Sequence, residues 1–159
     1  MDVLEKTDRI ASIVLDDMSI TRRAPEVERE RQTAIADLIA SNYFAPVGLN
    51  NGPYDLLLRA CDNRLTFCIS SNTISQPEEI RVSIKPFQRI IKDYFMMVES
   101  YLAAINGGQP HRIEAIDMGR RGVHNEGSEL LQTTLEDKIN LDFDTARRLF
   151  TLICVLHIK

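Results

Sequence analysis

The chain has 159 residues, of which 44% are hydrophobic and 26% are charged, and its formal net charge is −4 at pH 7. This balance is ordinary for a folded globular protein and excludes a disordered or fibrous chain. A mildly acidic chain without a long basic stripe is also a poor candidate for non-specific nucleic-acid binding, whose affinity comes mainly from neutralised phosphates. The length fits a single domain, 1–159.

Several features predict a cytoplasmic protein. The N-terminal sequence MDVLEKTDRI contains acids and no apolar run, so it does not predict a secretory signal. The longest apolar run, Leu149 to Ile158, is too short to span a bilayer. Cys61, Cys68 and Cys154 lack CxxC spacing, which is typical of reduced thiols rather than of disulfides or a zinc site. We expect no membrane association, no metal and no cofactor.

The first third of the chain predicts a strand, a helix and a loop. Asp8 to Leu15 has the apolar density of a half-buried strand. After a polar connection, Pro25 fits the first turn of a helix, because it lacks only an N–H group that would be unpaired there. This helix is expected to reach Asn42. The segment Tyr43 to Pro53 gathers prolines, glycines and asparagines and is predicted to be a loop, either packed on the sheet or folded over it as a lid.

Residues 54–85 predict antiparallel strands. Asp62-Asn63 is a tight-turn signal between the strands 54–61 and 65–71, because both residues tolerate positive φ. A two-residue turn sets Ala60 against Leu65, Leu58 against Phe67 and Leu56 against Ile69, all on one face. A third strand at 79–85 alternates in the same way. With the N-terminal strand, these segments predict an antiparallel sheet of three to four strands whose apolar face is covered by helices.

Helices are predicted for most of the chain after residue 85, which makes the domain α+β with a helical C-terminal half. Aromatic and aliphatic residues recur at helical spacing from Pro86 to about Asn106, and we expect this helix to lie on the apolar face of the sheet. The last segment starts after a polar turn with Asp142 or Asp144 as N-cap. Periodicity does not decide whether the apolar run that follows is a helix or a strand, but the cap favours a buried core helix.

The stretch Ile113 to Leu131 concentrates the unusual chemistry of the chain. It holds three of the seven glycines, two adjacent arginines, a histidine and several carboxylates. Each glycine disfavours a helix interior by about 1 kcal/mol relative to alanine, although the apolar spacing could continue through the stretch. We therefore predict a helix over 110–118, a tight turn over 119–125, and a new helix from Glu126 with Asn125 as its N-cap.

In that geometry, Gly119-Arg120-Arg121-Gly122 resembles an anion cradle, because glycines let backbone N–H groups converge while arginines supply bidentate donors. The residues predicted to bind a ligand are Gly119, Arg120, Arg121, Gly122, His124 and Asn125. The alternative is that Arg120 and Arg121 form internal ion pairs with nearby carboxylates and fix a corner between helices. No GxxxxGK[ST] or GxGxxG phosphate signature is present.

Catalysis is the second alternative for this stretch. Asp117, His124 and Glu126 are the compact set that could supply an acid and a base. No nucleophile elbow or HExxH motif accompanies them, so we lean against an enzyme. His124, Glu126 and Glu129 could ligate a metal in principle, but positions 124 and 126 do not share a helical face. No metal site is therefore predicted.

Long blocks of the sequence resemble a family of small uncharacterised bacterial proteins of unknown function. These blocks are KPFQRIIKDYF, IEAIDMGRRGVHNEGSELL and DFDTARRLFTLICVLH, with shorter pieces such as PEVERERQ and FAPVG before them. The likeness covers nearly the whole chain. It implies a bacterial, cytosolic origin and supplies neither an activity nor functional residues.

Taken together, these patterns predict a small binding or regulatory protein with its site at the corner from Gly119 to Glu126. The candidate partners are an anionic small molecule, an acidic protein segment or a second copy of the chain. A small enzyme and a purely structural interaction protein remain as alternatives. Nucleic acid is disfavoured because carboxylates neighbour all three Arg-Arg pairs, which begin at positions 22, 120 and 147.

Overall fold

A computed structural model describes residues 7–16, 25–108 and 110–156. The elements are β1 (Ile10–Asp16), α1 (Pro25–Ala40), β2 (Phe44–Pro46), β3 (Tyr54–Cys61), β4 (Arg64–Ser70), β5 (Glu78–Ser83), the 3-10 helix η2 (Lys85–Phe87), α2 (Gln88–Asn106), α3 (Pro110–Thr134), β6 (Ile139–Leu141) and α4 (Phe143–Leu156). The chain is therefore an α+β protein with a helical C-terminal half, as predicted. The polar connection before Pro25 and the arginine pair within it lie outside the described residues.

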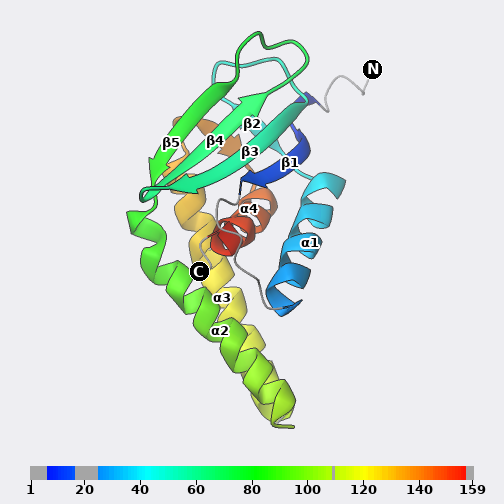
Figure 1. Cartoon of the computed structure of the whole chain (residues 1–159), viewed down its shortest axis with the longest axis vertical. Helices are drawn as coiled ribbons and strands as arrows, with labels where there is room; N and C mark the ends of the chain where they lie inside the picture. The colour runs from blue at the N-terminus through cyan, green and yellow to red at the C-terminus, as the bar shows by residue number, and fades with distance from the viewer. Residues whose placement is uncertain (1–6, 17–24, 109, 157–159) are drawn as a thin grey trace.

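The main sheet is mixed rather than wholly antiparallel. Its strand order is β1-β3-β4-β5 (Figure 1). β4 runs antiparallel to both of its neighbours, whereas β1 runs parallel to β3. The prediction of an antiparallel sheet was wrong at β1 because the connection from β1 to β3 carries α1, and such a long crossover lets two neighbouring strands run in the same direction.

The β3–β4 hairpin confirms the predicted register. Asp62 and Asn63 form its turn with φ values of 51° and 62°. The pairs across the hairpin are Ala60 with Leu65, Leu58 with Phe67 and Leu56 with Ile69. All of these except Ala60 are buried, so the face that they share belongs to the core.

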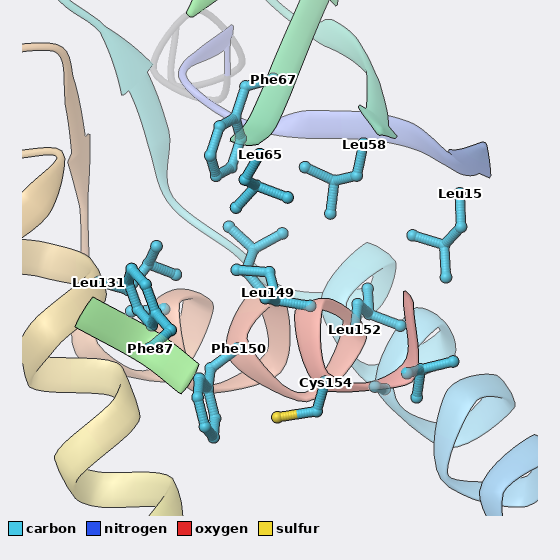
Figure 2. Close-up of a cluster of buried hydrophobic side chains, with 14 of the residues drawn as sticks. Leu15, Leu58, Leu65, Phe67, Phe87, Leu131, Leu149, Phe150, Leu152 and Cys154 are labelled. Carbon is cyan, nitrogen blue, oxygen red and sulfur yellow. The ribbon is translucent and has the colours of Figure 1, made fainter. Parts of the chain in front are cut away.

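α4 is the central core helix. The backbone N–H of Thr145 donates to Oδ1 of Asp142 at 2.9 Å, so Asp142 is the N-cap. The run from Leu149 to Val155 is buried and helical. Figure 2 shows Leu149 and Leu152 of α4 lying beneath side chains of the sheet. The apolar run at the end of the chain is therefore the helix that covers the sheet.

α2 does not lie on the sheet, and that prediction was wrong. α2 pairs with α3 as an antiparallel hairpin that extends away from the sheet (Figure 1). The buried stripe of α2 includes Tyr94 and Val98. The ring of Tyr94 lies 5.5 Å from that of His124 on α3. Helical periodicity indicates that one face is buried, but it does not identify the element that covers it.

α3 is one unbroken helix from Pro110 to Thr134. The predicted turn over 119–125, the N-cap role of Asn125 and the helix start at Glu126 were therefore wrong. Because the backbone N–H groups of Gly119 and Gly122 lie within the helix, they do not converge into an anion cradle.

Two of the glycines of α3 allow close helix packing instead of a turn. A Cβ atom at Gly127 would lie 2.4 Å from Cε1 of Phe150 on α4. A Cβ atom at Gly119 would lie 3.1 Å from Cε of Met97 on α2. Gly122 has nothing within 4 Å of that position. Contacts with α2 and α4 therefore account for Gly119 and Gly127.

The predicted loop after α1 contains a strand. β2 pairs antiparallel with β6, which itself lies in the segment predicted as a polar turn. Phe44 is fully buried, and the backbone N–H of Tyr43 donates to Oγ1 of Thr145 at 2.9 Å. The segment is therefore packed at the start of α4, whereas the side chain of Tyr43 remains exposed.

Asn42 joins the end of α1 to β1. Its Oδ1 atom accepts a hydrogen bond from the backbone N–H of Ile10 at 2.7 Å, and its Nδ2 atom donates to the carbonyl oxygen of Ile10 at 3.1 Å. Nδ2 also donates to the carbonyl oxygen of Leu38 at 2.8 Å. One side-chain amide thus fixes α1 against the sheet. Within the described ranges, no helix is long and apolar enough to cross a membrane.

Candidate functional site

A hollow of about 290 Å³ lies where α1, α3 and α4 meet. We call it the arginine hollow. It is lined by Glu30 of α1, by Asp117, Arg120, Arg121 and His124 of α3, and by Arg147 of α4. Residues three, four and seven positions apart share one face of a helix. The unbroken course of α3 therefore gathers its four residues on one wall, which the predicted turn would have dispersed.

The arginine hollow contains more positive than negative side chains. Three arginines line it, against the two carboxylates of Glu30 and Asp117. Nη1 of Arg120 lies 3.9 Å from Oε1 of Glu30, which is a long ion pair. In the part of the chain that the structure describes, neither Arg121 nor Arg147 forms an ion pair. Internal ion pairing therefore accounts at most for Arg120.

Glu30 and Arg120 are both held by aromatic residues. The hydroxyl of Tyr94 donates to Oε1 of Glu30 at 3.1 Å. Burial, with the negative charge of Glu30, raises the pKa of Tyr94, so this hydroxyl keeps its proton. The guanidinium carbon of Arg120 lies 5.4 Å from the centre of the Tyr101 ring, within the range of a cation–π contact.

His124 is buried at the wall of the arginine hollow. Its Nδ1 atom lies 2.9 Å from the carbonyl oxygen of Arg120. Because a carbonyl can only accept, Nδ1 carries the hydrogen, and Nε2 of the neutral ring is an acceptor. Burial is the main cause that lowers the pKa of His124, and the charge of Arg147 lowers it further. Near neutral pH the ring therefore adds no positive charge, and it would have to be protonated to donate from Nε2.

We expect the free energy of unfolding to fall as the pH drops below about 6.5, the ordinary pKa of histidine. Unfolded His124 titrates near that value, whereas the folded residue has a lower pKa. Between the two pKa values the unfolded chain binds more protons, so acid favours unfolding. Above both values the contribution of His124 is fully present. Urea unfolding of the wild type and of His124→Gln, from about pH 5 to about pH 8, measures this difference.

The exposed His111 of α3 supplies the control. A His111→Gln variant should keep the pH dependence of the wild type, whereas His124→Gln should flatten it. If His124→Gln keeps the full slope between about pH 5 and about pH 7, His124 is not the group responsible.

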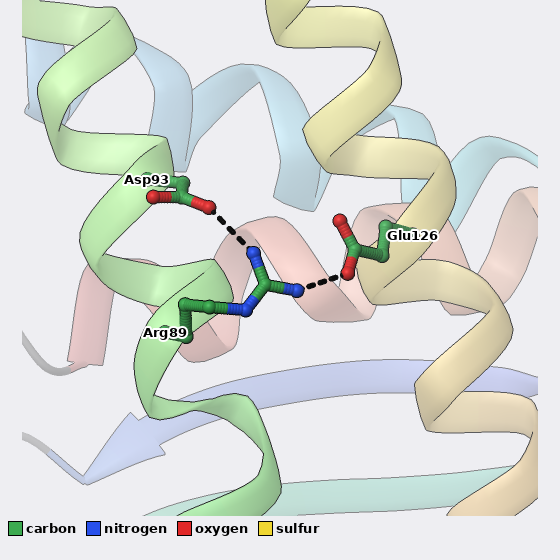
Figure 3. A network of polar contacts seen from close by, with 3 residues as sticks. All are labelled: Arg89, Asp93 and Glu126. Carbon is green, nitrogen blue, oxygen red and sulfur yellow. Dashed lines mark hydrogen bonds and ion pairs between the residues drawn. The ribbon is translucent and has the colours of Figure 1, made fainter.

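The three residues predicted from the sequence as candidates for catalysis, Asp117, His124 and Glu126, do not come together in the structure. Asp117 and His124 both line the arginine hollow. Glu126 points to another side of α3, where it forms an ion pair with Arg89 of α2 (Figure 3). Arg89 also donates to Oδ2 of Asp93 at 2.9 Å. Glu126 is therefore part of the α2–α3 contact and does not join the other two residues.

The predicted ligand-binding residues are divided in the same way. Arg120, Arg121 and His124 line the arginine hollow, whereas Gly119, Gly122 and Asn125 are not among its lining residues. Sequence reasoning missed two lining residues, Glu30 and Arg147. They lie far from the Ile113 to Leu131 stretch in the sequence, and only the packing of three helices brings them beside it.

None of the three cysteines lines the arginine hollow. Cys61, Cys68 and Cys154 are free thiols, and burial raises the pKa of Cys154. Among the described residues, no group of three histidine, cysteine, aspartate or glutamate side chains is placed to hold a metal ion.

Comparison with known proteins gives a family match over nearly the whole chain. The family described as Uncharacterised protein family (UPF0262) matches residues 7–159. A UPF0262 protein of Rhizobium etli is 54% identical over 149 residues, which are 94% of each chain. A relative from Paramagnetospirillum magneticum is 54% identical over 151 residues, covering 95% of this chain and 96% of its own. One from Azorhizobium caulinodans is 53% identical over 154 residues, covering 96% of this chain and 95% of its own. No solved structure matches the chain.

Proposed function

The chain belongs to the uncharacterised protein family UPF0262, and we propose that it is a binding protein that holds a small anion in the arginine hollow. The family description brings no activity, so the proposal rests on the geometry of the hollow. The observation that carries it is the meeting of three arginines from two helices around a space that contains two carboxylates. The free thiols agree with a place in the cytoplasm, where cysteines stay reduced.

The chemistry of the three arginines fits a carboxylate or a phosphate group. A guanidinium group presents a planar fork of donors that can bind either anion through two parallel hydrogen bonds. Arg121 and Arg147 have these donors available, because neither forms an ion pair with a described residue. The volume of about 290 Å³ is near the lower end of small-molecule pockets, about 300 to 1,000 Å³. A small anion therefore suits the hollow better than a folded partner does.

A change at Glu30 tests the proposal in the opposite direction from a change at an arginine. An anion in the hollow would compete with the Glu30 carboxylate for Arg120. Glu30→Gln keeps an oxygen that can accept the hydrogen bond from Tyr94, but it removes the negative charge. Removing an arginine should therefore weaken anion binding, and removing the charge of Glu30 should strengthen it.

A thermal-shift series against phosphate, citrate and nucleotides tests this prediction. An anion at about 100 times its Kd should raise the free energy of unfolding of the wild type by about 2.7 kcal/mol. For a domain of this size, that is a Tm increase of roughly 5 to 10 °C. We expect Arg121→Ala and Arg147→Ala to reduce the shift and Glu30→Gln to increase it at the same anion concentration.

Lys92→Ala is the control, since Lys92 is an exposed cationic residue on α2 that does not line the arginine hollow. It should leave the shift unchanged. The proposal is wrong if no anion stabilises the wild type, or if folded Arg121→Ala and Arg147→Ala proteins respond as the wild type does.

One observation favours an enzyme as the second candidate. The hydrogen bond from Nδ1 of His124 to the Arg120 carbonyl leaves Nε2 unprotonated, as a general base requires, at the wall of a hollow that could orient an anion. If the wild type consumes a bound anion and the His124→Gln variant does not, His124 acts as a general base. If an anion binds but is not consumed, only the binding function is supported.

A further inference from the structure

The outer edge of the sheet at β5 is open. β5 is the last strand in the order β1-β3-β4-β5, and no described strand pairs with its other side. Glu79, Arg81 and Ser83 are exposed, whereas Ile80 is partly buried and Val82 is buried. An edge strand presents unpaired backbone donors and acceptors, so it can add another strand.

The hydrogen bonds to β4 show which groups of β5 face outward. The backbone N–H of Ile84 donates to the carbonyl oxygen of Asn63 at 3.0 Å, continuing the register in which Val82 faces Leu65 and Ile80 faces Phe67. In an antiparallel ladder, alternate residues turn both backbone groups towards the same neighbour. The even-numbered residues of β5 therefore bond to β4. The backbone groups of Glu79, Arg81 and Ser83 face the open side.

We propose that β5 pairs antiparallel with β5 of a second copy of this chain, in the register that sets Ile80 opposite Ile80. This register brings the outward backbone groups of Glu79 opposite those of Arg81 in the second copy, and the reverse by symmetry. The two side chains then form opposite-charge pairs across the strands, which stabilise a sheet. The inference is independent of the arginine hollow.

Charge selects this register over its neighbours. A register centred on Arg81 would place Arg81 opposite Arg81, and one centred on Glu79 would place Glu79 opposite Glu79. Like charges directly opposite each other destabilise a strand pair. A register that sets an even-numbered residue opposite an odd-numbered one fails for another reason. The outward backbone groups of one copy would then face backbone groups of the second copy that are already bonded to its own β4. The Ile80-centred register alone unites outward backbone groups with two opposite-charge pairs.

The charges of β5 also limit what else could add to this edge. Within one chain, Nη2 of Arg81 already donates to Oε1 of Glu79 at 2.7 Å, so pairing would join two such ion pairs into a cluster of four charges. Pro77, just before β5, has no N–H group and ends the ladder. Charged residues and proline are typical protections of an edge strand against arbitrary partners. In this chain, the charges of β5 are complementary to β5 of a second copy.

Sedimentation of charge variants tests the pairing. Glu79→Arg and Arg81→Glu each place like charges opposite each other in their own pairs, so each should dimerise at least about tenfold more weakly than the wild type. A mixture of the two variants sets opposite charges together again and should restore the dimer. The double variant Glu79→Arg/Arg81→Glu should also restore it, because it exchanges the charges without changing their sum.

Lys92→Glu makes the same change of charge on α2, away from β5, and should leave dimerisation unchanged. Circular dichroism checks that every variant is folded. A wild-type chain that stays monomeric at about millimolar concentration overturns the proposal, as does a mixture of the folded single variants that stays as weak as either one alone.

Discussion

Replacing Leu152 with alanine should lower the free energy of unfolding by about 2 to 5 kcal/mol. Leu152 is fully buried on α4, between the helix and the sheet (Figure 2). Alanine there removes apolar contacts on both sides and leaves a cavity that neighbouring side chains only partly fill. Urea unfolding followed by circular dichroism measures the change at constant m-value.

Met96→Ala is the contrasting variant for α2. Met96 is 54% exposed, so the same loss of a large side chain should change stability by no more than about 0.5 kcal/mol. A mild effect at Leu152 would mean that α4 is not the helix that covers the sheet. A large effect at Met96 would mean that α2 is covered by an element other than those described.

Gly127→Ala should destabilise the protein by roughly 1 to 3 kcal/mol, although alanine favours a helix by about 1 kcal/mol over glycine. The added methyl group would meet three atoms of the Phe150 ring at 2.4 to 2.5 Å. Phe150 is fully buried, so its ring has little space in which to move. Thermal and urea unfolding of the variant measure the net effect.

Gly122→Ala lies on the same helix, and a methyl group there meets no atom within 4 Å. It should therefore stabilise the protein by up to about 1 kcal/mol. In a Phe150→Leu background, Gly127→Ala should cost less than it does alone, because the clashing ring is gone. If Gly127→Ala stabilises the protein as Gly122→Ala does, the contact between α3 and α4 is looser than the structure shows.

Local signals were sufficient where a few neighbouring residues determine the geometry. The turn at Asp62-Asn63 sets the pairing of β3 with β4, because a two-residue loop determines which positions face each other. The N-cap at Asp142 showed that the final apolar run is a helix, since a cap signals a helix start where periodicity is ambiguous.

Tertiary packing determines the features that the sequence patterns predict incorrectly. The cost of glycine in α3 is real but small, and burial of the helix against its neighbours outweighs it. The apolar spacing of Ile113, Ile116 and Val123 fits the continuous helix that the structure shows. The direction of β1 and the position of α2 depend on contacts between distant segments, which no local pattern contains.

The candidate site shows the same division. Asp117, Arg120, Arg121 and His124 could be named from the sequence because they lie in one short stretch, and the unbroken α3 then places them on one face. Glu30 lies in a highly charged segment of α1 that gives no local signal of burial. It nevertheless reaches the arginine hollow, where its carboxylate accepts a hydrogen bond from the buried Tyr94.

The amide of Asn42 has a consequence for how far an assembly of this chain can grow. It occupies both backbone groups of Ile10 at the β1 end of the sheet, where another strand would otherwise add. Pairing through β5 uses the same surface on both partners, so such a contact is isologous and complete with two chains. Open-ended growth would need a second contact at the β1 edges that remain, and Asn42 obstructs the addition of a strand there. The sheet can double without becoming a filament.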